Sequence, residues 1–388
     1  MFSSSSFELF IQLERNSYEG GGQVNGSVYL NVRNTVRAYA LSLLFNGQEF
    51  ARFTSMVPDP TPIPQEERER GTTSRPDIPK VYTKTKMFYS TEQALTSFPS
   101  GTINPGQYSF PFSFTLGQGV PSTFQHMWKT GAHQNDAIIS YTLTARLVDN
   151  NNFRVGQETI KYINVQNAMK DEDPALSTRK IDKNYHITNF CCKSAGEVRF
   201  VTYFEKDRYY SDEDVYIVCE INNSKGVLDV SSVRAIFSQV MKISVDNVTE
   251  EISRSIKSEK VDLNLPPEKS MTGSNAVRLM IPLKGKTGDF KAESTVNGSI
   301  IRCYHNVEVY LTLNTCCGTT PMNKISVSIF QRPEEQQARP SFANNSTMHV
   351  NKPFVFTPHV NAGNGAGSPT GGSGGAGNIG TNYPTMEW

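Results

Sequence analysis

The sequence contains no hydrophobic run long enough to span a membrane. None of its apolar stretches approaches the roughly 18 residues that a transmembrane helix needs. The N-terminal segment, MFSSSSFELF, lacks the basic start and the long apolar core of a secretion signal. These absences predict a cytosolic protein.

An excess of charge of one sign is also missing. The 38 Lys and Arg residues nearly balance the 37 Asp and Glu residues, which leaves a formal net charge of +1. This balance argues against a globally basic nucleic-acid-binding protein. At 388 residues the chain is long enough for two domains, each with its own hydrophobic core. We therefore expect two domains and no nucleic-acid partner.

The signatures of common enzymes are absent from the part of the chain between Phe7 and Gln331. This part has no nucleophile elbow, no phosphate-binding loop and no dinucleotide fingerprint. The six histidines show no HExxH spacing or similar metal-ligand spacing. We expect a protein that is not an enzyme and that has no cofactor and no metal site.

Cysteine is scarce, and its placement does not suggest a disulfide framework. Of the six cysteines, four form the neighbouring pairs Cys191–Cys192 and Cys316–Cys317. Without a secretion signal, we interpret them as reduced thiols. The two pairs could meet as a four-thiolate zinc site or be acylated. However, neighbouring residues of a strand point to opposite faces, which favours small core or strand-end residues.

The pattern that dominates the chain is an alternation of apolar and polar residues with a period of two, which predicts β-strands. It occurs twice in the same order. Tyr18 precedes Val24 by six residues, and Tyr209 precedes Val215 by the same spacing. Further alternating stretches follow in each copy: Leu41–Phe45 and Ile139–Leu147 in the first, Val233–Phe237 and Ile301–Leu311 in the second. The repeat predicts two similar all-β domains in tandem.

Changes in composition predict the boundaries of these domains. We expect a first domain at residues 1–168, a linker at 169–184, a second domain at 185–331 and a flexible tail rich in Gly, Asn and Ser at 332–388. The first domain contains a proline-rich insertion at 58–80, which we expect to be an extended surface loop. Asn46–Gly47 reads as the end of a strand, and Pro111 predicts an edge strand or a bulge.

Several strings of the sequence resemble the arrestin superfamily, and more narrowly the arrestin-domain-containing proteins, or α-arrestins. The matching strings of the first half are Gly22–Leu30, Leu43–Glu49, Gly106–Phe114, Pro121–Phe124 and Ile139–Leu147. Those of the second half are Cys191–Cys192, Gly196, Tyr210, Glu220–Ser224, Ala235–Gln239 and Ile301–Leu311. Their order over residues 7–331 makes the resemblance specific.

The resemblance implies two tandem immunoglobulin-like antiparallel β-sandwiches and a non-catalytic cytosolic adaptor. Such adaptors bind cytosolic tails or loops of membrane proteins, direct their endocytosis or endosomal sorting, and are recruited to the plasma membrane or endosomes. Many α-arrestins recruit ubiquitin ligases through a Pro-Pro-x-Tyr motif. In this sequence Pro266–Pro267 is followed by Glu268 and Lys269, which argues against that link. The alternative hypothesis is a structural or retromer-like subunit of a larger assembly.

Two further groups of residues are candidates for binding. Tyr383 and Met386 fit the Tyr-x-x-apolar pattern that clathrin adaptors bind as an extended peptide. A basic patch that reads phosphate could form on the first domain, with a solvated surface of mixed charge as the alternative. The residues of this candidate patch are Arg15, Arg33, Arg37, Lys84 and Lys86.

Overall fold

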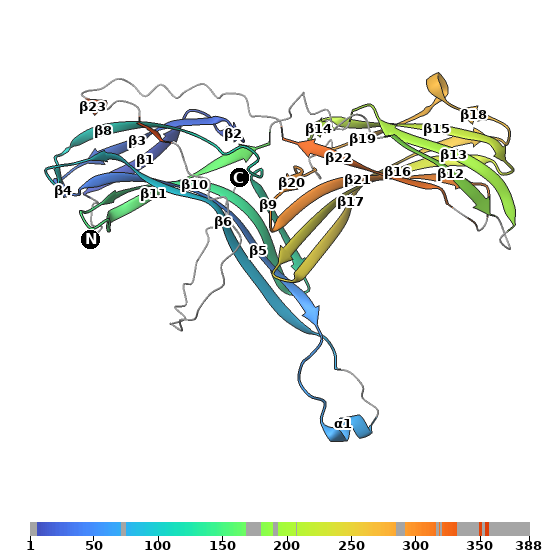
Figure 1. Ribbon diagram of the computed structural model, residues 1–388, viewed down its shortest axis with the longest axis horizontal. Coiled ribbons are helices and arrows are strands. Elements are labelled where there is room, and N and C mark those ends of the chain that lie inside the picture. Colours follow the sequence, from blue (N-terminus) through green and yellow to red (C-terminus); the bar gives the residue numbers. More distant parts are fainter. Residues whose placement is uncertain are drawn as a thin grey trace, which may run out of the picture.

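The structure is a computed structural model, and it describes residues 6–70, 75–167, 180–188, 193–206, 208–284, 292–315, 318, 320–331, 349–350 and 354–356. Most of these residues are in β-strands, and the fold is all-β as predicted. Figure 1 shows two elongated β-structures side by side, one from the first half of the chain (residues 6–167) and one from the second half (residues 180–331). Within the described residues, no helix has the length and apolarity to cross a membrane.

The strands of the first half largely match the alternating stretches of the sequence. They are β1 (Phe7–Leu13), β2 (Ser17–Glu19), β3 (Gln23–Val32), β4 (Val36–Arg37), β5 (Ala40–Val57), β6 (Ile78–Ser97), β7 (Thr102–Ile103), β8 (Gly106–Thr115), β9 (Phe124–Thr130), β10 (His133–Val148) and β11 (Arg154–Gln166). One sheet has the order β1-β3-β8, and the other has the order β2-β11-β10-β5-β6 with β9 also paired to β10. The pairing is antiparallel except between β2 and β11.

The two sheets of the first half pack face to face because each presents its apolar residues to the other. Phe45 of β5 and Phe114 of β8 come from different sheets, and their ring centroids lie 4.7 Å apart. Both side chains are almost fully buried. Burial of alternate residues on both facing sheets is the arrangement of a β-sandwich.

The second half repeats this arrangement. Its strands are β12 (Lys180–Thr188), β13 (Ser194–Phe204), β14 (Arg208–Tyr210), β15 (Asp214–Gly226), β16 (Val230–Val245), β17 (Val248–Leu265), β18 (Ser270–Met271), β19 (Val277–Pro282), β20 (Val296–Asn297), β21 (Ile301–Leu313) and β22 (Met322–Phe330). The order β14-β22-β21-β16-β17 matches β2-β11-β10-β5-β6 strand for strand. The other sheet contains β12, β13 and β15, with β18 and β19 also paired to β15.

The paired tyrosines that revealed the repeat have the same role in both halves. The Tyr18 hydroxyl accepts a hydrogen bond from the Arg15 N–H at 3.1 Å and donates one to the Asn25 carbonyl at 3.1 Å. The Tyr209 hydroxyl accepts from the Lys206 N–H and donates to the Tyr216 carbonyl, both at 3.4 Å. Each tyrosine therefore joins the residue three positions before it to the residue seven positions after it, which confirms the repeat.

One prediction about strand length was wrong. Asn46–Gly47 does not end a strand, since β5 runs on to Val57. Gly47 serves packing instead. A Cβ atom there would lie 2.7 Å from the Phe88 ring and 3.0 Å from the Tyr141 ring.

Other elements were missed by the sequence pattern. No strand was predicted at β9, which pairs with the first residues of β10. The predicted linker contains the start of β12, since Lys180 pairs with Tyr203 of β13. In the predicted tail, β23 (His349–Val350) and β24 (Phe354–Phe356) pair in parallel with β8 on either side of Pro111. The edge strand or bulge predicted from Pro111 was wrong, because β8 has neighbours on both sides and pairs with β3 without a register shift. Proline has no N–H to donate, and Pro111 is accommodated between the residues that pair with β23 and those that pair with β24.

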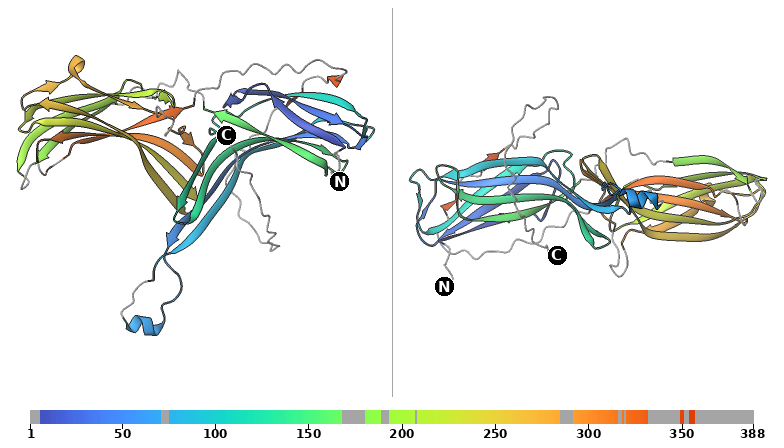
Figure 2. Two further views of the ribbon diagram at one scale, coloured as in Figure 1. Left: turned by 180° about the vertical axis from the view of Figure 1, so that it is seen from behind. Right: turned by 90° about the horizontal axis from the view of Figure 1, so that it is seen from below.

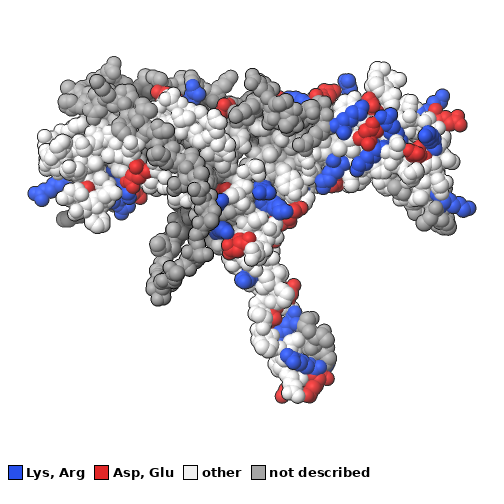
Figure 3. Space-filling model, viewed as in Figure 1, with Lys and Arg blue, Asp and Glu red and all other residues white. Residues whose placement is uncertain are grey.

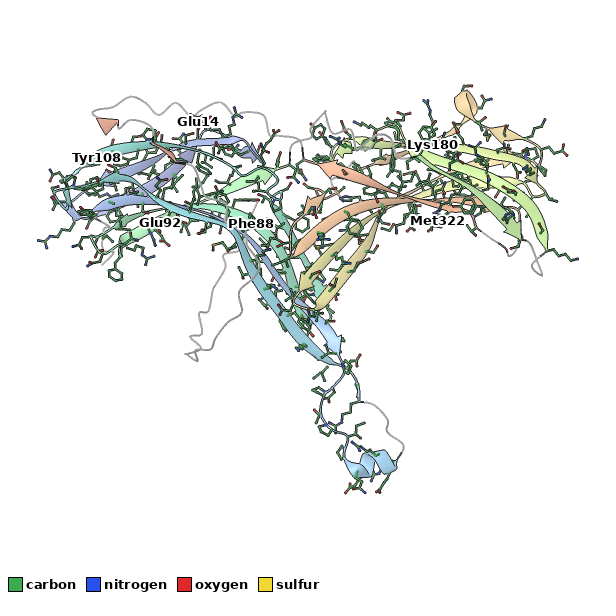
Figure 4. The ribbon with its side chains drawn as sticks, viewed as in Figure 1. Glu14, Phe88, Glu92, Tyr108, Lys180 and Met322 are labelled. Atoms are coloured by element: carbon green, nitrogen blue, oxygen red, sulfur yellow. The ribbon has the colours of Figure 1, made fainter. Side chains whose placement is uncertain are left out.

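Strands β5 and β6 extend well beyond the body of the first half as a two-stranded arm. Figure 2 shows the arm projecting away from both halves, with the helix α1 (Gln65–Glu69) at its tip. Paired residues continue to Val57 and Ile78, so the predicted loop insertion begins after a strand and ends within one. Glu92 lies on the part of β6 inside the first half, and Phe88 lies nearer the junction of the two halves (Figure 4).

Candidate functional site at the junction of the two halves

Glu49 is a buried acidic residue at the junction. It lies on β5, and the alternation of the strand puts it on the same face as the buried residues Ala51 and Phe53. Its relative exposure is only 2%. Burying a carboxylate without partners is very costly, so its hydrogen bonds must be accounted for.

The partners of Glu49 come from the second half of the chain. Its Oε1 atom accepts from the Ser299 N–H at 2.8 Å and from the Ser299 hydroxyl at 3.0 Å. Its Oε2 atom accepts from the N–H groups of Ile300 at 2.6 Å and Ile301 at 3.0 Å. Consecutive backbone N–H groups that converge on one carboxylate form an anion-binding concavity, and charge-assisted bonds of this kind are strong. Glu49 therefore fastens the first half to the start of β21.

Gly298 makes room for this contact. A Cβ atom at position 298 would lie 2.7 Å from the Glu49 Oε2 atom and 2.7 Å from the Ile301 carbonyl oxygen. The Gly298 N–H donates to that same carbonyl at 2.9 Å, which closes a tight turn before β21. Any side chain here would push the turn away from the carboxylate.

An apolar seam surrounds the Glu49 contact. Second-half residues belong to the same buried cluster as the core of the first half: Met241, Ile243, Val245, Val296, Ile300, Ile301 and Cys303. Figure 1 shows β16 and β17 running toward β5 and β9 at this junction. Because the two halves share one continuous core here, the seam holds them against each other.

Titratable groups near the seam are shifted toward their neutral forms. Burial, together with the charge of Glu49, raises the pKa of the Tyr141 phenol. Burial, together with Arg254 of β17, lowers the pKa of His126 on β9. Burial raises the pKa of the Cys303 thiol, so this cysteine stays an unreactive thiol. These shifts fit a structural junction and nominate no acid, base or nucleophile.

A groove of about 870 Å³ lies beside the seam and is lined by both halves. The first half contributes residues of β9, β10 and β11, among them Met127, Tyr162 and Gln166. The second half contributes Ser211, Asp212, Lys284, Glu293, Ser294 and Gln331. Most of the lining is hydroxyl, amide or apolar, so the groove has little net charge.

The structure does not gather the predicted basic residues on a single element. Arg33 follows β3 and forms an ion pair with Glu8 at 2.6 Å, and Lys84 of the arm pairs with Asp246 of the second half at 3.0 Å. The remaining residues lie in the turn between β1 and β2, on β4 and on β6: Arg15, Arg37 and Lys86. Figure 1 places β4 at the far end of the first half and β2 at its opposite end, toward the second half. The phosphate-reading patch stays a prediction, and Figure 3 shows both signs of charge over the face in view.

The other predicted sites lie outside the described residues. This applies to Tyr383 and Met386 and to the pairs Cys191–Cys192 and Cys316–Cys317. Among the described residues, no group of three His, Cys, Asp or Glu side chains could hold a metal ion.

Glu49 and Gln166 were not nominated from the sequence. Glu49 ends a string quoted for the family resemblance, yet one acidic residue in an alternating strand gives no sign of its burial. Its partners are separated from it by 250 to 252 positions and are mostly backbone groups, which no motif reveals.

Comparisons with known proteins agree with this architecture. Residues 7–171 match the family model described as arrestin (or S-antigen), N-terminal domain. Arrestin domain-containing protein A of Dictyostelium discoideum is 24% identical over 218 residues, which are 56% of this chain and 34% of that protein. The chain thus spans about a third of the length of the curated relative that it matches.

Proposed function

The chain is an arrestin-family protein, and on that premise we propose that it is a non-catalytic adaptor. In this proposal it binds cytosolic tails or loops of membrane proteins and directs their endocytosis or endosomal sorting. It works in the cytoplasm and is recruited to the plasma membrane or endosomes when it binds them. Proteins of this family are generally adaptors that act through binding surfaces.

The proposal is supported mainly by the structure of the junction between the two halves. Glu49 and the apolar seam join two β-sandwiches into one body, and the groove beside them takes residues from both halves. A body held together in this way can present a surface whose shape is fixed before a partner arrives. Preorganisation of this kind lowers the entropic cost of binding.

The arm supports the same proposal. Met56 of β5 and Val81 of β6 are 53% and 55% exposed. Met56 pairs with Pro79, and Val81 pairs with Thr54, so register places these residues on one face of the ribbon. Exposed apolar residues on a projecting element are typical of a surface that contacts other proteins.

Affinity purification of the tagged full chain from cells, followed by mass spectrometry, tests the proposal. Membrane proteins and coat proteins at varying ratios are the expected result. Recovery of one fixed stoichiometric complex without membrane cargo would instead identify a structural subunit and overturn the adaptor proposal.

A further inference from the structure

Gln166 has a buried polar atom without a partner at the wall of the groove. Its relative exposure is 7%, and within the described residues its side-chain Oε1 atom has no hydrogen-bond partner. The Gln166 backbone carbonyl is already used, since it accepts from the Gly20 N–H at 3.1 Å. An unpaired buried acceptor costs about 1–3 kcal/mol. Because Gln166 lines the groove, a rotation of its side chain would let this acceptor pair with a donor that enters the groove.

A strand edge runs along the same wall. Within the described residues, β9 pairs only with β10, so its other edge is open. β9 and β11 lie on the same side of β10, where β9 pairs with its first part and β11 with the part that follows. An open edge offers N–H and carbonyl groups to an extended peptide, which can add to it as a further strand.

Two large apolar side chains are exposed along the groove. Met127 of β9 is 52% exposed, and Tyr162 of β11 is 43% exposed. Both line the groove. Met127 pairs with Asp136 and Tyr162 pairs with Thr142, which lies six residues farther along β10. The thioether and the aromatic ring therefore suit two different apolar side chains of an extended peptide.

The charges of the groove restrict the ligand further. The charged residues that line the groove are one basic residue, Lys284, and two acidic residues, Asp212 and Glu293. The groove therefore favours neither a strongly acidic nor a strongly basic peptide. Its hydroxyl and amide groups suit the main chain, which offers both a donor and an acceptor at each residue.

We propose that the groove binds an extended, largely uncharged peptide segment of a partner protein. The peptide lies along β9, pairs a main-chain amide with the Gln166 side chain and places one apolar residue against Met127 and another against Tyr162. This inference deepens the proposed adaptor function and rests on it, because it assigns where a cargo segment docks.

Selection of a random peptide library displayed on phage against the immobilised full chain tests the site. Synthetic versions of the selected peptides are then titrated by fluorescence anisotropy. Met127→Glu is the test variant, and Met280→Glu is its matched control, since Met280 is 49% exposed on β19 outside the groove. Gln166→Leu removes the amide but keeps the size of the side chain.

Selected peptides are expected to bind the unmodified chain, to lose about tenfold or more in affinity with Met127→Glu, and to change less than about twofold with Met280→Glu. Gln166→Leu is expected to weaken binding about fivefold, which is roughly the effect of one lost hydrogen bond. Failure to select any peptide, or equal affinities for the two methionine variants, would overturn the groove proposal.

The two proposals fail in different ways. If Met127→Glu recovers the same membrane cargo from cells as the unmodified chain, the groove is not the docking site and the adaptor function stands. If selected peptides bind the groove but no membrane cargo is recovered, the adaptor function is overturned.

Discussion

Glu49 shows how one side chain can join two sandwiches. It is charged and 2% exposed, and its four donor contacts come from three consecutive residues of the other half. A hydrogen bond to a charged group contributes about 1.5–3 kcal/mol, and each buried donor left unpaired costs about 1–3 kcal/mol. This residue should therefore matter far more to stability than an ordinary surface carboxylate.

Glu49→Ala is expected to lower the free energy of unfolding by more than about 3 kcal/mol, since three backbone N–H groups lose their acceptor. Denaturant titration followed by circular dichroism measures the change. The control is Glu8→Ala, because Glu8 is exposed and pairs with Arg33 on the surface. A surface pair contributes about 0–1 kcal/mol, so similar losses for both variants would refute the role of Glu49.

Gly298→Ala tests the space around that carboxylate. The new methyl group would meet the Glu49 Oε2 atom at 2.7 Å, so we expect a loss of about 1–3 kcal/mol from overpacking. Gly20→Ala is the matched control, because the nearest atom to a Cβ there is 3.4 Å away. Thermal unfolding of the two variants distinguishes them, and equal melting temperatures would contradict the packing argument.

His305 predicts a loss of stability in mild acid. It is fully buried and stacked on Phe237, and burial lowers its pKa from 6.5 to about 3. The unfolded chain therefore binds a proton that the folded chain does not. The stabilisation is complete above the unfolded pKa near 6.5 and falls as the pH drops toward 3, by up to about 1.4 kcal/mol per pH unit.

His305→Phe keeps a ring against Phe237 and removes the titration. Between pH 6.5 and 5 its free energy of unfolding should fall less steeply with pH than that of the unmodified chain. The two slopes should differ by up to about 1.4 kcal/mol per pH unit, which is the slope for one proton bound on unfolding. Equal slopes for the two proteins would show that His305 does not bind a proton on unfolding.

At the scale of strands, the arm is an appendage to the sandwich. Strand pairing ends at Val57 and Ile78, and the described residues between them form local side-chain hydrogen bonds, such as Thr61 with Asp59 and Gln65 with Glu69. A segment that makes only local contacts adds little to the stability of the core.

Replacing residues 58–77 by Asn-Gly should therefore leave the fold intact. Asn-Gly forms the two-residue turn that a hairpin prefers. The expected change in melting temperature is less than about 2 °C, since about 1 kcal/mol shifts the melting temperature of a chain of this size by roughly 1–2 °C. A large loss of strand signal in circular dichroism would mean that the segment supports the sandwich.

Strands with strict alternation could be predicted from the sequence, and strands that depend on distant partners could not. Val24–Leu30 and Val215–Ile221 alternate clearly, and both lie in strands with one buried face. β9 was missed because it is short and only Phe124 among its residues is buried, so its apolar alternation is weak. Gly47 misled the prediction because glycine serves a turn and a tight packing position equally well.

For the whole molecule, the duplicated order of signals predicted two similar β-structures, and the matching sheet orders confirm this. The junction could not be predicted in the same way. The Glu49 site pairs one side chain with backbone groups more than 200 positions away. Gln166 stands out only because, within the described residues, its Oε1 atom has no hydrogen-bond partner. Residue types alone do not encode either feature.

Both functional proposals depend on the two halves forming one body. The measurement that tests this most directly is equilibrium unfolding of the full chain with Trp388 replaced by Phe, so that fluorescence reports Trp128 of β9, which packs against the core shared by the two halves. Circular dichroism reports the strands of both halves. The shared core and the Glu49 contact predict one transition at the same denaturant concentration by both probes. Two separate transitions, with fluorescence following one of them, would contradict a single body.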